Sequence, residues 1–287
     1  MAKVWLVTGS ARGLGRKIVE AALAAGERVV ATARDPRHLG DLVERFGEQV
    51  RAVALDVTDS AAAHAAVQAA VDAFGRLDVV VNNAGFGHLA PLEQASEEDF
   101  RAQIETNFFG VVNVTRAALP VLRKQRSGHI IQISSVGGRV GIPGLSAYQS
   151  AKWAVGGFTE VMSQEVAPLG IKVTALEPGG MKTEWGVEAG SALPDIIEDY
   201  APSVGAIAQM LSQYIGNEAG DPAKVAQVVL KLAYHEQPPV HLLLGSDALH
   251  YAGEAEKARA ASGEAWRPVS LATDFTAAAT LPEFPQP

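Results

Sequence analysis

Tyr148 and Lys152 are the residues whose types and spacing first suggest chemistry in this sequence. They stand four residues apart in "SAYQSAK", at the start of an Ala- and Gly-rich run of helical character, so both side chains lie on one helix face, one turn apart. A phenol with a pKa of about 10 can donate a proton but is a reluctant base. An ammonium about 4 Å away stabilises phenolate by roughly 4 kcal/mol at an effective dielectric of about 20, which would lower the pKa of Tyr148 by up to about three units, toward neutrality. A half-exposed surface pair is the alternative, and the pair alone does not decide between the two.

Seven short runs rich in apolar and β-branched residues recur between segments of helical character. They are "KVWLVTG" (3–9), "RVVATAR" (28–34), "VRAVALDV" (50–57), "LDVVVNNA" (77–84), "HIIQISSV" (129–136), "IKVTALEPG" (171–179) and "VHLLLG" (240–245). Runs that are apolar on both faces are typical of a parallel sheet covered by helices. We therefore predict an α/β fold, a doubly wound (Rossmann) parallel seven-stranded sheet with helices on both faces and right-handed crossovers. Ligands of such sheets bind at the carboxyl ends of the strands.

Length and composition restrict the class of protein. The chain has 287 residues, and we expect one domain over 1–250, with a lid over the ligand at about 180–220 and a tail at 251–287. A formal charge of −8 without a basic stripe argues against a nucleic-acid partner. No cysteine is present and the seven histidines lack paired spacing, so we expect no metal site. We expect no signal peptide and no membrane span, and therefore a cytoplasmic protein.

Polar and Gly-rich residues follow several of the predicted strands. "TGSARGLG" opens a helix after the first strand, and its glycines would let the backbone approach a phosphate at the helix N-terminus. A tight turn without a ligand is the alternative, since the spacing is not the G-x-G-x-x-G of the usual dinucleotide motif. Asp56, after the third strand, could accept from an adenine amino group or could cap a helix. "NNAG" (82–85) suits close approach to a ribose or to a neighbouring strand.

Four motifs occur together in the order and spacing of a known family. "TGSARGLG", "NNAG", "YQSAK" and "EPGGMKT" match TGxxxGxG, NNAG, YxxxK and PGxxxT, and the sequence thereby resembles the short-chain dehydrogenase/reductases over roughly residues 3–245. The resemblance implies a nicotinamide dinucleotide bound across the sheet and hydride transfer to or from a carbonyl carbon. It implies an active site of four residues, Asn107, Ser135, Tyr148 and Lys152.

The resemblance also implies a role for each of these residues. Lys152 would bond the nicotinamide ribose, and Asn107 would hold a water that links Lys152 to solvent; an amide bonded to helix backbone is the alternative for Asn107. Ser135 would donate to the developing oxyanion. Its neighbour Ser134 competes for this role, because only one of two consecutive strand side chains can face Tyr148, and the family's interval of thirteen residues before the tyrosine selects Ser135.

The residues expected to bind the dinucleotide come from the same resemblance. Thr183 would contact the nicotinamide carboxamide, while Pro178 and Gly179 would shape its pocket; a simple loop turn is the alternative for this motif. The full expected set is Gly9, Arg12, Gly13, Leu14, Gly15, Arg34, Asp56, Val57, Asn83, Ala84, Gly85, Tyr148, Lys152, Pro178, Gly179 and Thr183.

The end of the second strand, "ATARDP", bears on which dinucleotide is used. An acidic residue there takes the ribose hydroxyls of NAD, whereas the 2′-phosphate of NADP needs cations. Asp35 and Arg34 compete for this position, and the strand pattern ends at Ala33, so Arg34 is the first residue beyond it. Arg12 would add a second cation. The alternative is that both arginines are solvated charges and that Asp35 caps a helix. We predict NADP(H) as the preferred cofactor, with NAD(H) possible.

The leading functional prediction is an NADP(H)-dependent carbonyl reductase or secondary alcohol dehydrogenase acting on an apolar ketone or alcohol, with Tyr148 as acid and base. "VVATARDP" and "NNAGFGHLAPLEQ" resemble the branch with carbonyl, hydroxysteroid and retinal-type reductases. Two alternatives are an NAD-dependent alcohol dehydrogenase of the same family and a non-catalytic dinucleotide-sensing protein. We also expect a homo-oligomer. The apolar lid residues are Trp185, Leu193, Ile196, Ile197, Tyr200, Ile207, Met210, Leu211, Tyr214 and Ile215, and the sequence does not divide those that pack the lid from those that face a substrate.

Overall fold

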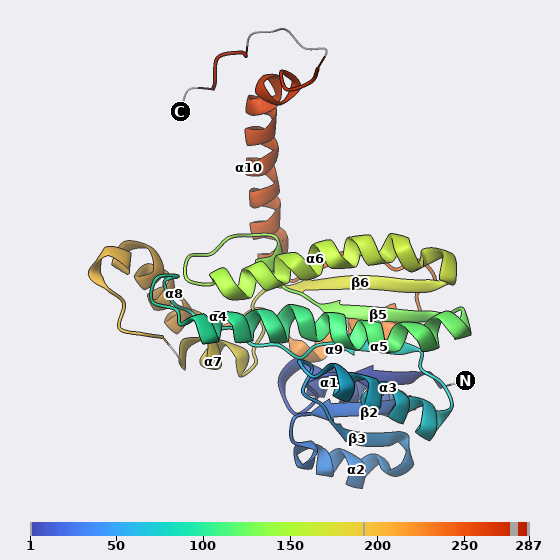
Figure 1. Ribbon diagram of the computed structural model, residues 1–287. Coiled ribbons are helices and arrows are strands. Elements are labelled where there is room, and N and C mark those ends of the chain that lie inside the picture. The colour runs from blue at the N-terminus through green and yellow to red at the C-terminus, as the bar shows by residue number, and fades with distance from the viewer. Residues whose placement is uncertain (1, 192, 276–280, 286–287) are drawn as a thin grey trace.

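A seven-stranded, fully parallel sheet forms the centre of the molecule (Figure 1). A computed structural model describes residues 2–191, 193–275 and 281–285. The strand order is β3-β2-β1-β4-β5-β6-β7, which reverses between β1 and β4 as a doubly wound sheet requires. The strands are β1 (Val4–Val7), β2 (Arg28–Ala33), β3 (Val50–Ala54), β4 (Val79–Asn82), β5 (Gly128–Ile133), β6 (Ile171–Pro178) and β7 (His241–Leu244). Six lie within one of the seven predicted runs, and β5 begins one residue before its run, at Gly128, so the fold prediction is confirmed.

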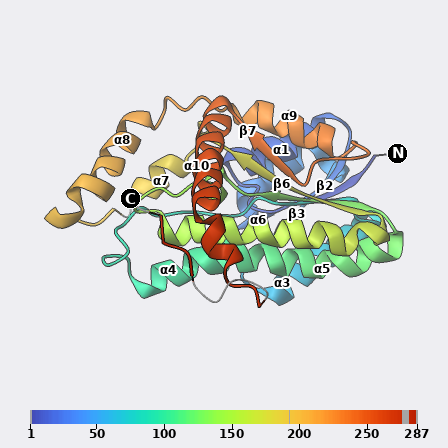
Figure 2. The ribbon, with the colours of Figure 1, turned by 90° about the horizontal axis from the view of Figure 1, so that it is seen from above.

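Helices cover both faces of the sheet, because successive strand residues contribute apolar side chains to opposite faces. On β1, Trp5 and Val7 pack on one side and Val4 and Leu6 on the other. Figure 2 shows α1 and α9 on one side of the sheet and α3, α5 and α6 on the other. The helices are α1 (Gly13–Ala24), α2 (Gly40–Phe46), α3 (Ser60–Phe74), α4 (Glu97–Ile104), α5 (Gly110–Gln125), α6 (Ser146–Val166), α7 (Trp185–Ser191), α8 (Ala206–Tyr214), α9 (Pro222–Leu232) and α10 (Ser246–Leu271). No helix of the described residues is long and apolar enough to cross a bilayer.

The segment from 181 to 220 is a folded excursion with a closed stem. Met181 and Gly220 form an isolated parallel bridge, in which the Gly220 N–H donates to the Gly180 carbonyl at 3.0 Å and the Lys182 N–H donates to the Gly220 carbonyl at 3.1 Å. The excursion contains α7 and α8. Its two ends therefore leave and rejoin the body side by side, after β6 and before α9.

The structure divides the apolar residues of this excursion into two sets. A small core of Leu89, Leu145 and Val204 anchors the excursion to the body, and the lid residues packed against it are Ile196, Tyr200, Ile207 and Leu211. By contrast, Leu193, Ile197 and Met210 are 37%, 43% and 49% exposed. The first set packs the segment onto the body, and the second is free to contact other molecules.

Helix α10 projects from the body at the β7 edge of the sheet (Figure 1). The expected start of the tail at residue 251 falls inside this helix, which begins at Ser246. The reason is that the turn after β7 runs directly into the helix, so the described chain has no linker at that point.

Candidate active site

Helix α6 carries Tyr148 and Lys152 into the body of the protein, both buried. The Lys152 ammonium lies 5.6 Å from the centre of the Tyr148 ring and donates a hydrogen bond of 2.8 Å to the Ile133 carbonyl, at the carboxyl end of β5. Burial disfavours the charged form and lowers the pKa of Lys152 to about 8. The pair is therefore not a half-exposed surface contact.

The pKa of Tyr148 moves in the direction opposite to the one expected from the lysine. Burial raises it to about 12, and an interaction with the Ser135 side chain opposes this rise. Desolvation of a phenolate outweighs the benefit of the nearby ammonium in this arrangement. At neutral pH, Tyr148 is accordingly a protonated phenol that can donate.

The two serines at the end of β5 face different groups. The Ser135 side chain interacts with the Tyr148 phenol, and its hydroxyl accepts from the Gly137 N–H at 3.0 Å. The buried Ser134 hydroxyl donates instead to the Lys152 carbonyl, at 3.3 Å, on the backbone of α6. The structure thus brings Ser135 to the phenol and uses Ser134 to fasten the helix to the sheet.

Asn107 lies in a π-helical turn, Glu105–Phe109, between α4 and α5. Its Nδ2 donates to the carbonyls of Phe86 and Gln103, at 2.7 and 2.8 Å, which is the backbone role considered as the alternative. Its Oδ1, however, is buried and has no partner in the described part of the chain. A Cβ placed on Gly85 would lie 2.5 Å from this oxygen and 3.7 Å from the Lys152 ammonium nitrogen. An open acceptor therefore lies close to the lysine, where a water can join the two.

The glycine-rich turn after β1 is shaped by its contact with the end of β4. Gly9 has φ +65°, and a Cβ on Gly15 would stand 2.3 Å from the Gly9 carbonyl oxygen, so neither position accepts a larger residue. The Asn83 amide donates to the carbonyls of Thr8 and Gly9, at 2.9 and 3.1 Å. Asn83 thus holds the glycine-rich turn to the end of β4, which is the contact with a neighbouring strand considered as the alternative to a ligand contact.

Helix α1 offers free backbone donors at its N-terminus. Its first residue follows Arg12, whose side chain caps nothing, and no acidic residue lies in the first turn. Helices α3 and α9, by contrast, begin with capping aspartates, Asp59 and Asp221. The uncapped amino end and its positive dipole fit a phosphate group. Leu14, in the first turn, is buried in the core.

Other expected dinucleotide contacts are held by local structure. The exposed Asp56 accepts from the backbone and hydroxyl of Thr58, at 3.0 and 2.8 Å, so it closes a turn, and the cap of α3 is Asp59 instead. Val57 is buried against α5. Thr183 stands over the glycine-rich turn, since a Cβ on Gly13 would lie 3.8 Å from the Thr183 Cβ.

Asp247 is a residue of this region that sequence reasoning missed. Its carboxylate accepts from the Gly180 N–H at 2.8 Å and from the Tyr214 hydroxyl at 3.3 Å, and a Cβ on Gly179 would overlap it. It therefore joins the turn after β6 to α8 of the excursion. The sequence did contain a signal for Asp247, because this residue follows the seventh strand, at the carboxyl edge where ligands of such sheets bind.

Trp185, the first residue of α7, covers the phenol. Its ring lies 5.0 Å from that of Tyr148, centre to centre. Gly87 lies against both rings, because a Cβ placed on it would stand 2.9 Å from an atom of each. The excursion thus closes directly over the tyrosine and shields it from water.

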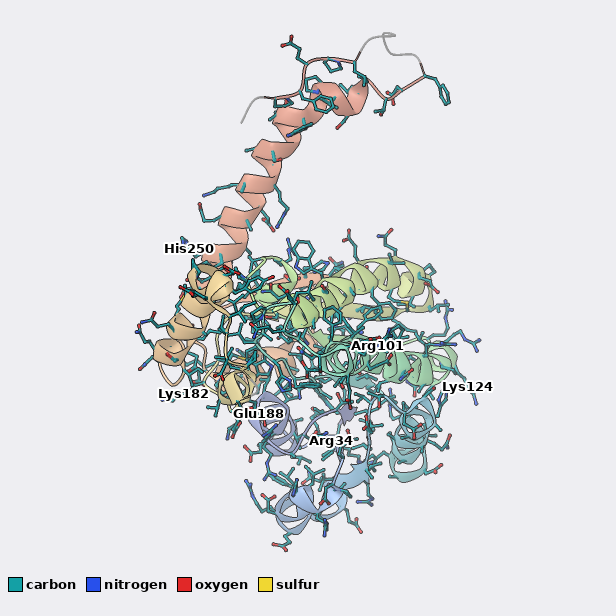
Figure 3. All side chains as sticks on the ribbon, turned by 60° about the vertical axis from the view of Figure 1, so that its left-hand side comes forward. Arg34, Arg101, Lys124, Lys182, Glu188 and His250 are labelled. Atoms are coloured by element: carbon teal, nitrogen blue, oxygen red, sulfur yellow. The ribbon has the colours of Figure 1, made fainter. Side chains whose placement is uncertain are left out.

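Some of the charged residues expected near the adenosine are paired with other described side chains, and one is not. Asp35 accepts from the Arg37 backbone N–H at 3.0 Å and pairs with its guanidinium at 2.6 Å, which lowers the pKa of the carboxyl to about 2. Arg12 is paired with Glu188 of α7 at 2.5 Å. Arg34, labelled in Figure 3, is exposed, and no side-chain bond joins it to another described residue. Of the two expected cations, Arg34 is free and Arg12 is engaged.

These features together fit a nicotinamide dinucleotide along the carboxyl edge of the sheet. The uncapped helix faces a glycine-rich turn, an unpartnered buried oxygen and a lysine lie at the centre, and a free cation stands beyond β2. Within the described residues no group of three or more His, Asp or Glu side chains could hold a metal ion.

Comparison with known proteins is consistent with this geometry. Residues 3–193 match the family model described as short chain dehydrogenase. The chain is 53% identical over 276 residues to "Oxidoreductase BOA17" of Botryotinia fuckeliana, covering 95% of this chain and 100% of that protein. It is 36% identical over 244 residues to a "3-ketodihydrosphingosine reductase" of Bacteroides thetaiotaomicron, covering 85% and 88%.

Solved structures show the same likeness. A short-chain dehydrogenase from Streptomyces avermitilis superposes with a TM-score of 0.89 at 39% identity, covering 96% of this chain and 100% of that one. An alcohol dehydrogenase from Thermococcus sibiricus complexed with 5-hydroxy-NADP gives a TM-score of 0.70 at 26% identity, covering 85% and 96%. A 3-ketoacyl-(acyl-carrier-protein) reductase from Brucella melitensis complexed with NADH gives 0.72 at 26%, covering 84% and 96%.

Proposed function

Because the chain belongs to the short-chain dehydrogenase family, we propose that it is an NADP(H)-dependent carbonyl reductase or secondary alcohol dehydrogenase acting on an apolar ketone or alcohol. Membership makes it an NAD(P)-dependent oxidoreductase; the direction, substrate class and cofactor preference are the proposal. The observation that carries it is the buried, protonated Tyr148. It lies between Ser135 and Lys152 and beneath Trp185.

The proposed chemistry divides between the cofactor and this chain. A nicotinamide dinucleotide, when bound, supplies the hydride in reduction and accepts it in oxidation. The chain would hold its phosphates at the glycine-rich turn (9–15), and the turn after β6 (178–183) would hold its nicotinamide end. In the reductive direction Tyr148 gives its phenolic proton to the carbonyl oxygen, and the Ser135 hydroxyl stabilises the negative charge that develops there.

Proton return to Tyr148 is assigned to Lys152 and Asn107. With a pKa lowered to about 8, the lysine can release and regain a proton near neutral pH, and the unpartnered Asn107 Oδ1 lies on the same side of Gly85. In the reductive direction a water between the two groups would lead a proton inward from solvent to Lys152 and Tyr148. This assignment gives a function to the unpartnered Oδ1 of Asn107, whose structural hydrogen bonds are made by Nδ2 alone.

The apolar substrate class rests on the excursion over the site. Trp185 contacts the phenol, and Leu193, Ile197 and Met210 are exposed apolar residues of the same segment. Relatives at 36% and 32% identity carry names of reductases of keto compounds. The preference for NADP(H) rests on the free Arg34 and the engaged Asp35, and the NAD-dependent alternative needs Asp35 to leave Arg37.

We further propose a cytoplasmic homo-oligomer with one catalytic domain. The location follows from the nicotinamide dinucleotide supply on which the proposed reaction draws. Exposed apolar residues on α6, among them Trp153 and Val161 at 44% and 63% exposure, support association between subunits.

Tyr148→Phe tests the catalytic assignment. The substitution keeps the ring against Trp185 and removes only the hydroxyl, so dinucleotide affinity should stay unchanged while turnover falls by at least about 100-fold. The measurement follows nicotinamide absorbance with a panel of apolar ketones, and dinucleotide binding is titrated separately. Near-normal turnover in the Phe variant would remove Tyr148 from the reaction, whereas a wild-type protein that binds the dinucleotide but reduces nothing would favour the sensing alternative.

A further inference from the structure

Helix α10 extends well beyond the body that carries it. At 1.5 Å per residue, its 26 residues span about 39 Å. Its root is fixed by the buried Ala248 and Ala252, by an ion pair between Arg139 and Glu256, and by Arg259, which donates to the Arg139 carbonyl at 2.9 Å. Past Arg259 the helix leaves the body, and residues 260–268 are exposed (Figure 3, where His250 marks the root). A lone helix of this kind is marginal in water, and packing normally stabilises it.

We propose that α10 pairs with α10 of a second copy of this chain, antiparallel, about a two-fold axis that passes between Ala260 and Ala261. In this register, residue i lies opposite residue 521 − i of the second copy. The interface is isologous, so each contact occurs twice.

The charges of the helix are complementary in this register. Lys257 lies opposite Glu264 of the second copy. Two-fold symmetry doubles this pair, which gives two attractive pairs. The seam has no like-charge pair along 250–271, where like charges would oppose association.

One face of the helix carries this seam, and it points away from the body. Its residues follow the three- and four-residue spacing of a helix face: Leu249, Gly253, Lys257, Ala260, Glu264, Arg267 and Leu271. Ala252 and Arg259, which hold the root to the body, are offset to the other side. Trp266, nine residues after Lys257, lies opposite the seam and packs against Phe284 with ring centres 5.3 Å apart. No side-chain bond in the described residues joins the seam to the body; within the helix Lys257 pairs with Glu254 at 2.9 Å, and the far side is already in use.

The side chains at the crossing and at the ends suit the same pairing. Ala260 and Ala261 at the axis allow two helix backbones to approach closely. Leu271, 54% exposed at the tip, lies opposite residue 250 and thus beside Leu249 of the second copy, which is 61% exposed at the root. Each end of the seam thereby buries two exposed leucines that nothing in the described chain covers.

Cysteine cross-linking of the full-length protein tests the axis directly, because the native chain has no cysteine. Under mild oxidation Ala260→Cys should yield disulfide-linked pairs of chains on a non-reducing gel. Ser262→Cys is the matched control, also exposed but on the other side of the helix, and should stay unlinked. Failure of Ala260→Cys to link, or equal linking by both variants, would overturn the proposal.

A charge-swap series tests the register independently. Lys257→Glu places like charges opposite each other and should weaken association by at least about tenfold, measured as the concentration at which the native mass halves in sedimentation. Adding Glu264→Lys to the same chain should restore it. Helix content by circular dichroism and turnover should stay constant across the series, since these residues lie outside the site. If Lys257→Glu leaves the concentration at which the native mass halves unchanged, the proposal is overturned, and a different surface or partner covers the helix.

Discussion

Dinucleotide preference is expected to depend on Arg34, and Arg34→Ala should narrow the advantage of NADPH over NADH. The guanidinium is exposed, stands directly after β2 and has no partner in the described chain, so it is available to the 2′-phosphate. The variant should raise KM for NADPH while leaving KM for NADH and both kcat values nearly unchanged, because the lost contact lies far from the reacting atoms.

The size of the effect follows from exposure and competition. A charge-assisted contact at an exposed site contributes about 1 kcal/mol, or roughly fivefold. Arg12 can add a similar amount only after it leaves Glu188, and breaking that exposed pair costs up to about 1 kcal/mol. The wild-type preference should therefore be about five- to tenfold in kcat/KM, and Arg34→Ala should remove most of it.

Substitutions of Arg37 and Glu188 test whether Arg34 acts through a specific contact with the 2′-phosphate or only through its positive charge. Arg37→Ala removes an equal charge three residues away but frees the Asp35 carboxylate, so NADH should improve. Glu188→Gln releases Arg12 and should improve NADPH.

Initial rates with both dinucleotides at fixed ionic strength supply the numbers for all three variants. A wild-type protein that works better with NADH would refute the reasoning, as would equal losses of NADPH efficiency in Arg34→Ala and Arg37→Ala.

Three further outcomes are expected. Ser135→Ala should lower turnover by about 100- to 1000-fold, whereas Ser134→Ala, which removes a bond to helix backbone, should be mild; the reverse ranking in steady-state assays would exchange their roles. Tyr214→Phe removes a bond to Asp247 at 3.3 Å and should raise substrate KM about two- to fivefold with dinucleotide affinity unchanged, and equal losses in both titrations would place the bond in the core instead. Burial lowers the pKa of His129 to about 4, so the unfolded chain binds the extra proton below about pH 6.5 and stability is lost as pH falls toward 4, by at most roughly 3 kcal/mol from this residue. Urea unfolding at pH 7 and 5 should show this loss, and a His129→Gln variant with the same slope would assign it elsewhere.

The strands and the tyrosine helix were predictable because their signal is local. Apolar runs of strand length mark the sheet, and its parallel order then brings Ser135 and the glycine-rich turn to one edge. The second strand was expected to end at Ala33, and β2 ends at that residue. Each of these features depends on a few consecutive residues and on a general rule of sheet topology.

Features that depend on distant partners were not predictable in the same way. The pKa of Tyr148 reflects burial by residues as remote as Gly87 and Trp185, and its direction was therefore expected wrongly. The pair between Arg12 and Glu188 joins residues 176 positions apart. The π-helical turn at Asn107 has an ordinary helical sequence, and its irregular bonds are selected by packing against the loop after β4.

The bridge between Met181 and Gly220 makes the intervening chain an exchangeable cassette. Since its ends are adjacent, a cassette of different length or composition can replace it without stretching β6 or displacing α9, and a longer cassette adds only a small closure cost. The four residues assigned to the chemistry, Asn107, Ser135, Tyr148 and Lys152, all lie outside it, whereas Thr183 and Trp185 lie within it. If Thr183 and Trp185 are kept, evolution or engineering can vary the rest of the segment, and thus the substrate that enters, while the four catalytic residues stay constant, so substrate range can diverge faster than reaction type.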